Sequence, residues 1–382
     1  MNSDRLRGLA EAPGPFVSLY VEGAVDDRFS SARWTAIRRH LEESGVTERT
    51  TGAVERALLN YRPGPRRRGH AIIAGAHGLL LDEPLVHPRS VTVLRVSDYP
   101  YVLPLFGVGA ARPPYVVAAV DRLGADLTVH CGQNTAREVV HGEGFPVHKP
   151  ASAGLNGYGD HQHSTEEAVR MNIRATVDRI TELTDRSHAE LIFMCGEVRS
   201  RSDVVSELPH RIATRVIALP ACAGGGRVDE HEIAESIDQE LDRRGNDAVD
   251  MIVARFRSER SRRSGLAVEG LPEICAALSD GAVDTLIIAD LHSATVVTGD
   301  DRTVIASDAS ALSMFGEPAR RVALADEALP FVAIATDASV VVCPEDFFSA
   351  VDGVAALLRY PHVATGDSSA DSPARQSPAV PL

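Results

Sequence analysis

Short apolar runs rich in β-branched residues alternate along this chain with longer segments that carry apolar residues at helical spacing. TLIIADL and SVVVC are strand-like runs, and residues 166–184 place apolar side chains on one face of a helix. Such alternation favours layered α/β domains, because each helix buries its apolar stripe against a sheet. At 382 residues the chain is long enough for two or three domains. We therefore predict an α/β protein with mixed sheets layered with helices.

The sequence divides into three predicted domains and a tail. We expect an N-terminal α/β domain over residues 1–110, a middle domain over 112–264 and a C-terminal α/β domain over 265–362. The proline-marked stretch YPYVLPLFGVGAARPPY links the first two domains, and Pro113 and Pro114 near its end favour an extended boundary. The tail, 363–382, is rich in Ser, Pro, Ala and Asp, a composition typical of disorder.

Local patterns predict the elements of each domain. In the first domain PFVSLYVEG is a strand, residues 28–60 are helical and GHAIIAGAHGLLLDEPL is a hairpin. In the middle domain YVVAAVDRLGADLTVHCG is two strands around a turn, AELIFMCGE and RIATRVIALPA are strands, and residues 229–263 are helical. In the last domain LAVEGLPEICAAL is a helix, and TLIIADL, ATVVTG, FVAIAT and SVVVC are strands.

Composition limits the class of protein. The apolar and charged fractions, 44% and 24%, are ordinary for a soluble globular chain. No apolar run is long enough to span a bilayer, and the N-terminus lacks a hydrophobic signal core, so we expect a cytoplasmic protein. The net charge of -14 argues against a nonspecific nucleic-acid binder. We expect neither membrane nor DNA as a partner.

The cysteines are five in number and widely scattered, with no CxxC pair. This arrangement argues against a disulfide framework and against a zinc knuckle. We therefore expect buried thiols.

The most unusual stretch is residues 150–167, PASAGLNGYGDHQHSTEE. It carries three glycines, and only Leu155 could anchor it in a core. A long polar segment inside a compact chain is usually functional or disordered. Ser164 and Thr165, followed by glutamates, predict a capped helix start directly after this loop. Our hypothesis is that the loop inserts into a partner.

Three blocks of sequence resemble one known family. GLPEICAALSDGAVDTLIIADL, DGVAALLRY at 352–360 and YVVAAVDRLGADLTVHCGQNTAREVVH are similar to blocks of the archaeo-eukaryotic class-one release factors and Pelota. The resemblance covers about 112–362, with the blocks in the family's order. It is strongest to the bacterial branch, near the group of the ribosome hibernation factor Balon and its actinobacterial relatives. It implies a release factor/Pelota-like fold with three domains, in which DGVAALLRY closes the chain as a helix.

The resemblance also implies a function. In release factors a middle-domain loop carries Gly-Gly-Gln into the peptidyl-transferase centre. Here the matching segment reads GLNGYGDHQH, and Gln162 is adjacent to neither Gly157 nor Gly159. The first domain also lacks the Asn-Ile-Lys-Ser motif of stop-codon readers. The resemblance therefore implies a ribosome-binding factor that occupies the A site without hydrolysis, accompanied or delivered by EF-Tu, with no catalytic residues and no cofactor.

Candidate RNA contacts follow from this reading. Aromatic rings and histidines can stack on unpaired bases, and amides can bond base edges or 2′-hydroxyls. The alternative for Tyr158 is that it packs back on its own domain. The candidate residues for the loop are Gly154, Asn156, Gly157, Tyr158, Gly159, Asp160, His161, Gln162 and His163.

Arginine clusters supply candidates for phosphate contact, because a guanidinium suits bidentate phosphate recognition. Solvated helix faces and loops are the alternative explanation for such clusters. The candidates are Arg66, Arg67 and Arg68 in one run, and Arg199 and Arg201, which we place on a loop after a strand.

Other chemistry remains open at this point. Asp160, His161 and His163 are a fragment of a metal site, but a site needs three or four converging ligands, so we predict none. A second hypothesis is a ribosome-rescue peptidyl-tRNA hydrolase that uses Gln162. A third hypothesis is a protein-interaction scaffold that does not bind the ribosome.

Overall fold

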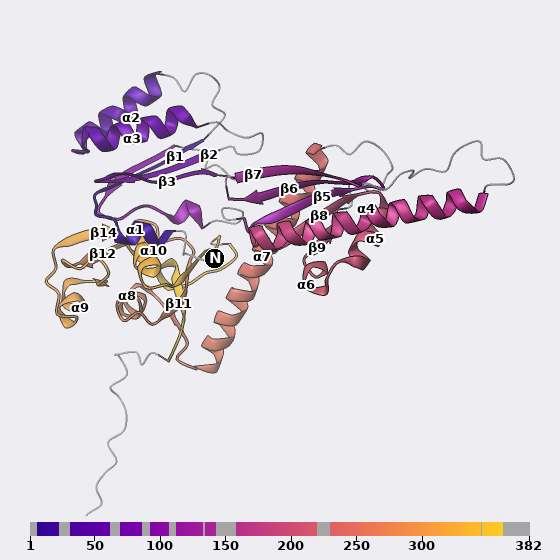
Figure 1. Cartoon of the computed structure of the whole chain (residues 1–382). Coiled ribbons are helices and arrows are strands. Elements are labelled where there is room, and N and C mark those ends of the chain that lie inside the picture. The colour runs from indigo at the N-terminus through magenta and orange to yellow at the C-terminus, as the bar shows by residue number, and fades with distance from the viewer. Residues whose placement is uncertain are drawn as a thin grey trace, which may run out of the picture.

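The computed structural model describes residues 6–22, 31–61, 69–85, 92–106, 112–132, 134–142, 158–219, 230–344 and 346–361. Within these ranges the strands form four sheets, and helices are layered on them (Figure 1). The predicted mixed α/β class is confirmed. No helix in these ranges combines the length and the apolar character that crossing a membrane requires.

The N-terminal domain is an antiparallel sheet in the order β3-β2-β1-β4. The predicted strand and hairpin are confirmed, and the predicted helical region is two helices. The first of these carries Trp34, which is partly buried against the core. The elements are α1 Arg7–Glu11, β1 Phe16–Glu22, α2 Ser31–Glu43, α3 Glu48–Asn60, β2 Gly69–Gly75, β3 Gly78–Leu85 and β4 Val93–Ser97, followed by the 3-10 turn Leu103–Leu105.

Both faces of this sheet are covered, because side chains alternate along β1. Val17 and Leu19 face α2 and α3, whereas Phe16 and Tyr20 face the opposite way. Thr47 caps α3 by accepting a hydrogen bond from the backbone N–H of Thr50 at 3.4 Å. The face that carries Phe16 packs against the C-terminal domain.

The middle domain is a five-stranded mixed sheet in the order β7-β6-β5-β8-β9. The pairs β5–β6 and β6–β7 are antiparallel, whereas the pairs β5–β8 and β8–β9 are parallel. The predicted strand pair and the strand AELIFMCGE are confirmed. RIATRVIALPA is only partly a strand, because its first half forms α6. The elements are β5 Tyr115–Val120, β6 Gly124–Cys131, β7 Asn134–His141, α4 Tyr158–Ser187, β8 Leu191–Gly196, α5 Val198–Glu207, α6 His210–Ala213 and β9 Val216–Ala218.

Helix α7, Glu230–Arg262, is shared between two domains. Near its start Ile237 and Leu241 pack against the middle-domain sheet. Near its end Val253 and Phe256 pack against the C-terminal sheet. The predicted helix over 229–263 is confirmed, and the predicted domain boundary at 264 falls just beyond it.

The C-terminal domain contains a mixed sheet in the order β10-β16-β11-β15 and a small antiparallel sheet in the order β13-β12-β14. Its predicted helix-turn-strand unit, α8 to β11, is confirmed. The elements are β10 Ala267–Glu269, α8 Leu271–Ser279, β11 Val283–Ile288, β12 Thr295–Thr298, β13 Ile305–Ala306, α9 Ala309–Met314, β14 Arg321–Leu324, α10 Ala325–Ala335, β15 Ser339–Val342, the 3-10 turn Val351–Gly353 and β16 Val354–Leu358.

Three predictions for this domain were wrong. FVAIAT is the end of α10 and not a strand. DGVAALLRY is not a closing helix, because its residues 354–358 form β16 between two other strands. In LAVEGLPEICAAL the first residues form β10, and the helix begins only at Leu271. FVAIA and VAALL consist of apolar residues only, so these stretches lack the alternation that separates strand from helix. In LAVEGLPEICAAL the strand and the helix are separated at Gly270, which has a φ of 91°.

The N-terminal and C-terminal domains share one hydrophobic core. It contains Phe16, Tyr20 and Tyr99 from the first domain together with Ile274 and Phe331 from the last. The ring centroids of Tyr99 and Phe331 are 5.1 Å apart in an edge-to-face contact. The two domains are therefore packed as one body, and α7 extends from it to the middle domain (Figure 1).

The cysteine prediction is confirmed at three positions and wrong at one. Cys195, Cys275 and Cys343 are buried thiols, whereas Cys131 is exposed at the end of β6. Burial raises the pKa of Cys275 to about 12. Cys222 and the predicted disordered tail lie outside the described residues.

Candidate functional surface of the middle domain

Helix α4 projects beyond the sheet on which it packs (Figure 1). Its apolar face fixes it to the sheet through Ile173, Val177, Ile180 and Leu183, all of which are buried. The helix is already formed at Tyr158, so its first turns lie ahead of the residues that pack. The sequence predicts this apolar face correctly but places the helix start too late.

The end of β7 is held against the middle of α4. The backbone of Gly142 approaches Asn172 so closely that a Cβ atom there would lie 1.9 Å from Oδ1 of Asn172. Asn172 also donates from Nδ2 to the backbone carbonyl of Arg122 at 2.9 Å. Tyr158 precedes Asn172 by fourteen positions, which at the helical rise is about 21 Å. The segment between β7 and α4 therefore connects the sheet to a distant helix end.

The structure changes the predicted conformation of the loop. Tyr158, Gly159, Asp160, His161, Gln162 and His163 belong to the first turns of α4, so their assignment to a loop was wrong. The predicted helix start near Ser164 was wrong for the same reason. Neither Gly nor Pro occurs between Asp160 and Ser187, so nothing in that stretch interrupts the helical hydrogen bonds. A search for helix breakers would have moved the boundary towards Tyr158.

The rest of the predicted loop lies outside the described residues, Gly154, Asn156 and Gly157 included. The side chains of residues 158–165 are not described either. The RNA contacts predicted for this segment therefore stay predictions. Among the described residues, no group of three or more His, Cys, Asp or Glu is arranged to hold a metal ion.

The two predicted phosphate-binding arginines of this domain lie on α5 and not on a loop. Arg199 is exposed to 81%, and its nearest acidic partner is Asp203 at 3.9 Å. Arg201 donates to the backbone carbonyl of Leu219 at 3.3 Å and is partly buried. Arg199 is thus available to a ligand, whereas Arg201 ties α5 to the sheet edge. Arg66, Arg67 and Arg68 lie outside the described residues.

Most other arginines of the middle domain are paired with carboxylates. Arg122 makes a bidentate pair with Glu197, with contacts of 2.7–3.1 Å. This hydrogen bonding lowers the pKa of Glu197. Arg179 bridges α4 to Glu138 on β7 at 2.5 Å, and lowers the pKa of that carboxyl group in the same way. These pairs fix the helix and strands relative to one another.

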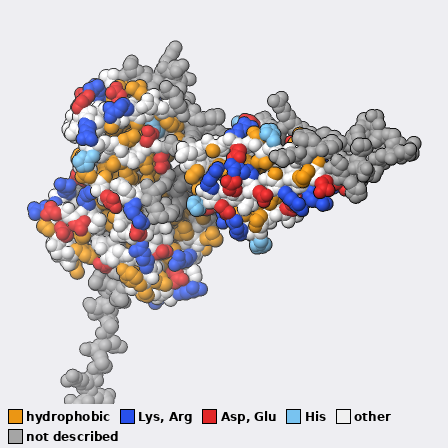
Figure 2. All heavy atoms as spheres, in the orientation of Figure 1, with side chains coloured by type: hydrophobic (Ala, Val, Ile, Leu, Met, Phe, Trp, Pro, Cys, Tyr) orange, Lys and Arg blue, Asp and Glu red, His pale blue; other side chains and the backbone are white. Residues whose placement is uncertain are grey.

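Three arginines on α4, Arg170, Arg174 and Arg186, are exposed and have no ion pair among the described residues, and the sequence analysis did not single them out. Arg170 and Arg174 lie one helical turn apart. Their i, i+4 spacing was a readable signal that both lie on one face. Elsewhere on the visible face of the middle domain, basic and acidic side chains are intermixed (Figure 2). Where α4 packs on the sheet, its outer face therefore carries two exposed arginines, with the exposed Glu166 and Glu167 one turn before them.

Comparison with known proteins places the chain in a family. The profile of the bacterial archaeo-eukaryotic release factor family 2 matches residues 114–262. Protein Rv2629 of Mycobacterium tuberculosis strain H37Rv is 47% identical over 364 residues, which cover 94% of this chain and 97% of the relative. The match to this relative therefore spans all three sheet-bearing domains.

Solved structures of release-factor and Pelota proteins are similar at lower identity. The archaeal translation termination factor aRF1 is 17% identical, with 93% of this chain and 96% of that chain covered and a TM-score of 0.25. Archaeal Pelota, in a model of its ribosome-bound state with ABCE1, is 14% identical, with 94% of each chain covered and a TM-score of 0.38. The chain belongs to the bacterial branch of the archaeo-eukaryotic release factor and Pelota family, as a member of its bacterial family 2.

Proposed function

We propose that this protein is a cytoplasmic ribosome-binding factor that occupies the A site without hydrolysing peptidyl-tRNA, as a silencing factor under stress. One observation carries the proposal: this chain has the middle domain of a release-factor family, but it lacks the family's catalytic Gly-Gly-Gln triplet. Its α4 extends about 21 Å beyond the contact between Gly142 and Asn172. No Gly-Gly-Gln occurs anywhere in the chain.

A projecting helix α4 without the Gly-Gly-Gln triplet supports ribosome binding rather than hydrolysis of peptidyl-tRNA. A helix held at its base can carry the segment before it into a deep cavity. The glutamine that the family uses has no equivalent next to a glycine pair, because Gln162 lies between two histidines. We therefore propose that the protein is not an enzyme and needs no cofactor. The segment 154–163 would contact rRNA near the peptidyl-transferase centre, and the unpaired Arg170 and Arg174 would contact phosphate.

EF-Tu is the proposed delivery partner. This part of the proposal rests on family resemblance, and the test is direct. Purified ribosomes are mixed with the full chain, with and without EF-Tu, and pelleted through sucrose. We expect the chain to co-sediment, to be displaced by A-site tRNA and to bind more completely with EF-Tu present. Failure to pellet with vacant ribosomes would contradict the proposal.

Crosslinking tests the placement of the loop, because Lys149 is the only lysine in the chain. A photo-crosslinker attached through an amine-reactive group labels Lys149 and the N-terminal amine alone. We expect crosslinks from Lys149 to rRNA of the peptidyl-transferase centre, and their loss in Lys149→Arg. Crosslinks that persist in this variant come from the N-terminus and serve as the control.

Peptide release separates the proposed factor from a hydrolase. Ribosomes that carry labelled peptidyl-tRNA with an empty A site are incubated with the chain, with a release factor as the positive control. We expect no release above the rate without protein. Release that is lost in Gln162→Ala would replace the proposal with the rescue hydrolase.

A further inference from the structure

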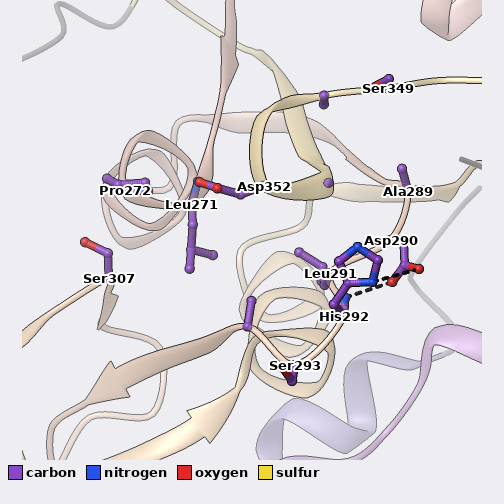
Figure 3. Close-up of a pocket in the computed structure, with 13 residues that line it drawn as sticks. Leu271, Pro272, Ala289, Asp290, Leu291, His292, Ser293, Ser307, Ser349 and Asp352 are labelled. Carbon is purple, nitrogen blue, oxygen red and sulfur yellow. Dashed lines mark hydrogen bonds and ion pairs between the residues drawn. The ribbon is translucent and has the colours of Figure 1, made fainter.

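Two surfaces on the C-terminal domain are candidate ligand sites: a pocket of about 580 Å³ at the start of α8 (Figure 3) and the arginine-rich end of α7. The carboxylates of the pocket are already bonded within the chain. Asp290 accepts from the backbone N–H of His292 at 2.8 Å and lies 3.1 Å from its ring nitrogen, and Asp352 accepts from the backbone N–H of Leu271 at 2.9 Å. These acids do not require a ligand, so the end of α7 is the stronger candidate.

The end of α7 reverses the charge of the chain. Residues 255–263, RFRSERSRR, contain five arginines and one glutamate, whereas the whole chain has a net charge of -14. Solvated helix faces often carry such runs. The orientation of these arginines and the partners they already have therefore decide between a solvated face and a binding surface.

The packing of α7 turns several of these arginines outwards. Phe256 is buried against the C-terminal sheet. Arg255 and Arg262 are 56% and 70% exposed, and their spacing of seven positions places them on one face, about 10 Å apart along the helix axis. Arg263 follows the helix directly and is exposed as well. This end of α7 is the lower one in Figure 1, away from the middle domain.

Two of the arginines have only loose acidic partners. Arg255 lies 3.4 Å from Asp284, and Arg262 lies 3.4 Å from Glu259 in the preceding turn. Exposed ion pairs of this length are weak, because water screens both charges. A phosphate group accepts two parallel N–H bonds from one guanidinium and can therefore displace such partners.

Two further arginines have no ion pair among the described residues. Arg257 donates to the backbone carbonyl of Phe347 at 3.4 Å, and Arg263 has no acidic partner in the same part of the chain. Arg260 differs, because it pairs with Glu269, whose side chain is largely buried. Four guanidinium groups at this end of α7 are therefore accessible to an anionic ligand.

An exposed aromatic ring lies beside these arginines. Phe348 is buried and packs edge-to-face on Phe256, with ring centroids 5.5 Å apart. The backbone N–H groups of Phe347 and Phe348 both donate to the carbonyl of Pro344, at 3.0 and 3.1 Å. These bonds fix the turn, so the ring of Phe347 stays 42% exposed. The preceding Asp346 is exposed too and adds one negative charge next to the ring.

The combination of arginines and a fixed aromatic ring favours RNA as the ligand. An RNA loop offers phosphates to guanidinium groups and an unpaired base to the ring. A protein interface usually has an apolar centre, but Met251 is the only large apolar side chain of α7 that is exposed. An acidic peptide would engage the arginines and leave Phe347 without a stacking partner.

We propose that the end of α7 and the turn at Phe347 form a binding surface for an unpaired loop of RNA. Arg255, Arg257, Arg262 and Arg263 contact phosphates, and Phe347 stacks on an unpaired base. The proposal rests on the function proposed above only in naming that RNA as ribosomal. It gives the C-terminal domain an RNA contact of its own, separate from the segment 154–163.

Fluorescence anisotropy with the full chain tests the ligand class. The probes are a fluorescein-labelled RNA hairpin with an unpaired loop, a blunt RNA duplex of the same stem, and labelled polyglutamate. We expect the duplex to bind about tenfold more weakly than the hairpin, because it offers no base for stacking. Equal binding of hairpin and duplex, or no binding of the hairpin, overturns the proposal. Polyglutamate that binds more tightly than the hairpin assigns the surface to an acidic protein and also overturns it.

An arginine variant places the phosphate contacts. The double variant Arg257→Gln with Arg263→Gln breaks no ion pair among the described residues, so its melting temperature should stay unchanged. We expect it to bind the hairpin about tenfold more weakly, and the slope of log K against log salt to fall by about two, one for each phosphate contact. The matched control changes Arg49 and Arg56 to glutamine, two exposed arginines of α3. Equal weakening by the control would assign the effect to total charge and refute the surface.

A variant of the aromatic ring tests stacking separately. Phe347→Leu keeps an apolar side chain but removes the flat ring. We expect it to lower hairpin affinity to that of the duplex and to leave duplex binding unchanged. Phe315→Leu is the control, because Phe315 is 38% exposed elsewhere in the same domain. Hairpin binding that is undiminished in Phe347→Leu refutes the stacking contact.

Pelleting with vacant ribosomes separates this surface from the proposed function. We expect the native chain to pellet, and the double variant Arg257→Gln with Arg263→Gln to be released at lower salt. A variant that pellets as the native chain does at every salt concentration refutes this surface and leaves the proposed function intact. If the native chain fails to pellet, the proposed function is contradicted, and the hairpin titrations alone decide the surface.

Discussion

Arg95 and Glu327 form an ion pair at 3.0 Å across the junction of the N-terminal and C-terminal domains, although 232 positions separate them in the chain. The carboxylate of Glu327 is almost fully buried and also accepts from Ser97 at 2.5 Å. The guanidinium of Arg95 lies 3.7 Å from the ring centroid of Tyr101. The pair is therefore part of the joint core that makes the two domains one body.

Removing Arg95 should destabilise both domains together. In Arg95→Met the buried Glu327 keeps only the hydroxyl of Ser97 as a partner. We expect the free energy of unfolding to fall by about 2–3 kcal/mol. This loss is at or below the low end of the range for a broken, fully buried ion pair, because the Arg95 side chain is partly exposed.

Urea unfolding followed by Trp34 fluorescence measures this effect, since Trp34 is the only tryptophan. Arg95 also pairs with Asp326 at 2.9 Å. The double variant Arg95→Met with Glu327→Met therefore removes the buried Glu327 charge but leaves Asp326 without its Arg95 partner, and it should recover only part of the loss. A double variant that is less stable than Arg95→Met would contradict this expectation, because it would show that Glu327 stabilises the fold even without Arg95.

The buried His70 should make stability depend on pH. Its ring stacks on Tyr61 at 4.0 Å, and its Nε2 lies 2.5 Å from Asp82. Burial lowers the pKa of His70, and the Asp82 contact offsets this only in part. The unfolded chain then takes up the proton at a higher pH than the folded chain. The contribution of neutral His70 to the stability of the folded chain is therefore complete above about pH 6.5. It is lost as the pH falls towards the pKa of His70 in the folded chain.

Comparison with His70→Phe isolates this contribution. The stability difference between the native chain and the variant should shrink as the pH is lowered from 7.5 to 5.5 in urea titrations. A difference that stays constant over this interval, or that grows on acidification, contradicts the assignment.

The residue at position 245 should affect how rigidly α7 connects the middle domain to the joined N-terminal and C-terminal domains. It lies in α7 between Leu241, which packs on one sheet, and Val253, which packs on another. Gly245→Ala should stabilise the helix by about 0.5–1 kcal/mol, and Gly245→Pro should break it at a cost of about 3 kcal/mol. Small-angle scattering should show a broader distribution of dimensions for the proline variant, with the alanine variant as control. Identical profiles would mean that α7 does not set the spacing.

Arg170 and Arg174 should contribute to ribosome affinity through phosphate contacts. We expect the double glutamine variant to bind vacant ribosomes about tenfold more weakly at low salt, and with a shallower dependence on salt. The control changes Arg49 and Arg56 to glutamine, two exposed arginines of α3. If the control pair weakens binding equally, the effect reflects total charge rather than this face of α4.

Sequence alone determined the class of the protein and the elements whose apolar residues follow a clear period. The face of α4 that includes Ile173 and Ile180, the hairpin of β2 and β3, and the α8–β11 unit could all be predicted, because local spacing dictates which side is buried. The missing Gly-Gly-Gln is likewise a property of the sequence.

Tertiary structure decided the elements that are covered on every side. Helix α10 lies inside the joint core and β16 lies between two strands, so neither shows a polar face that would reveal its period. The contact of Arg95 with Glu327 and the hydrogen bond from Leu271 to Asp352 join residues far apart in the chain. Such meetings depend on how whole sheets and helices pack, and no local pattern encodes that packing.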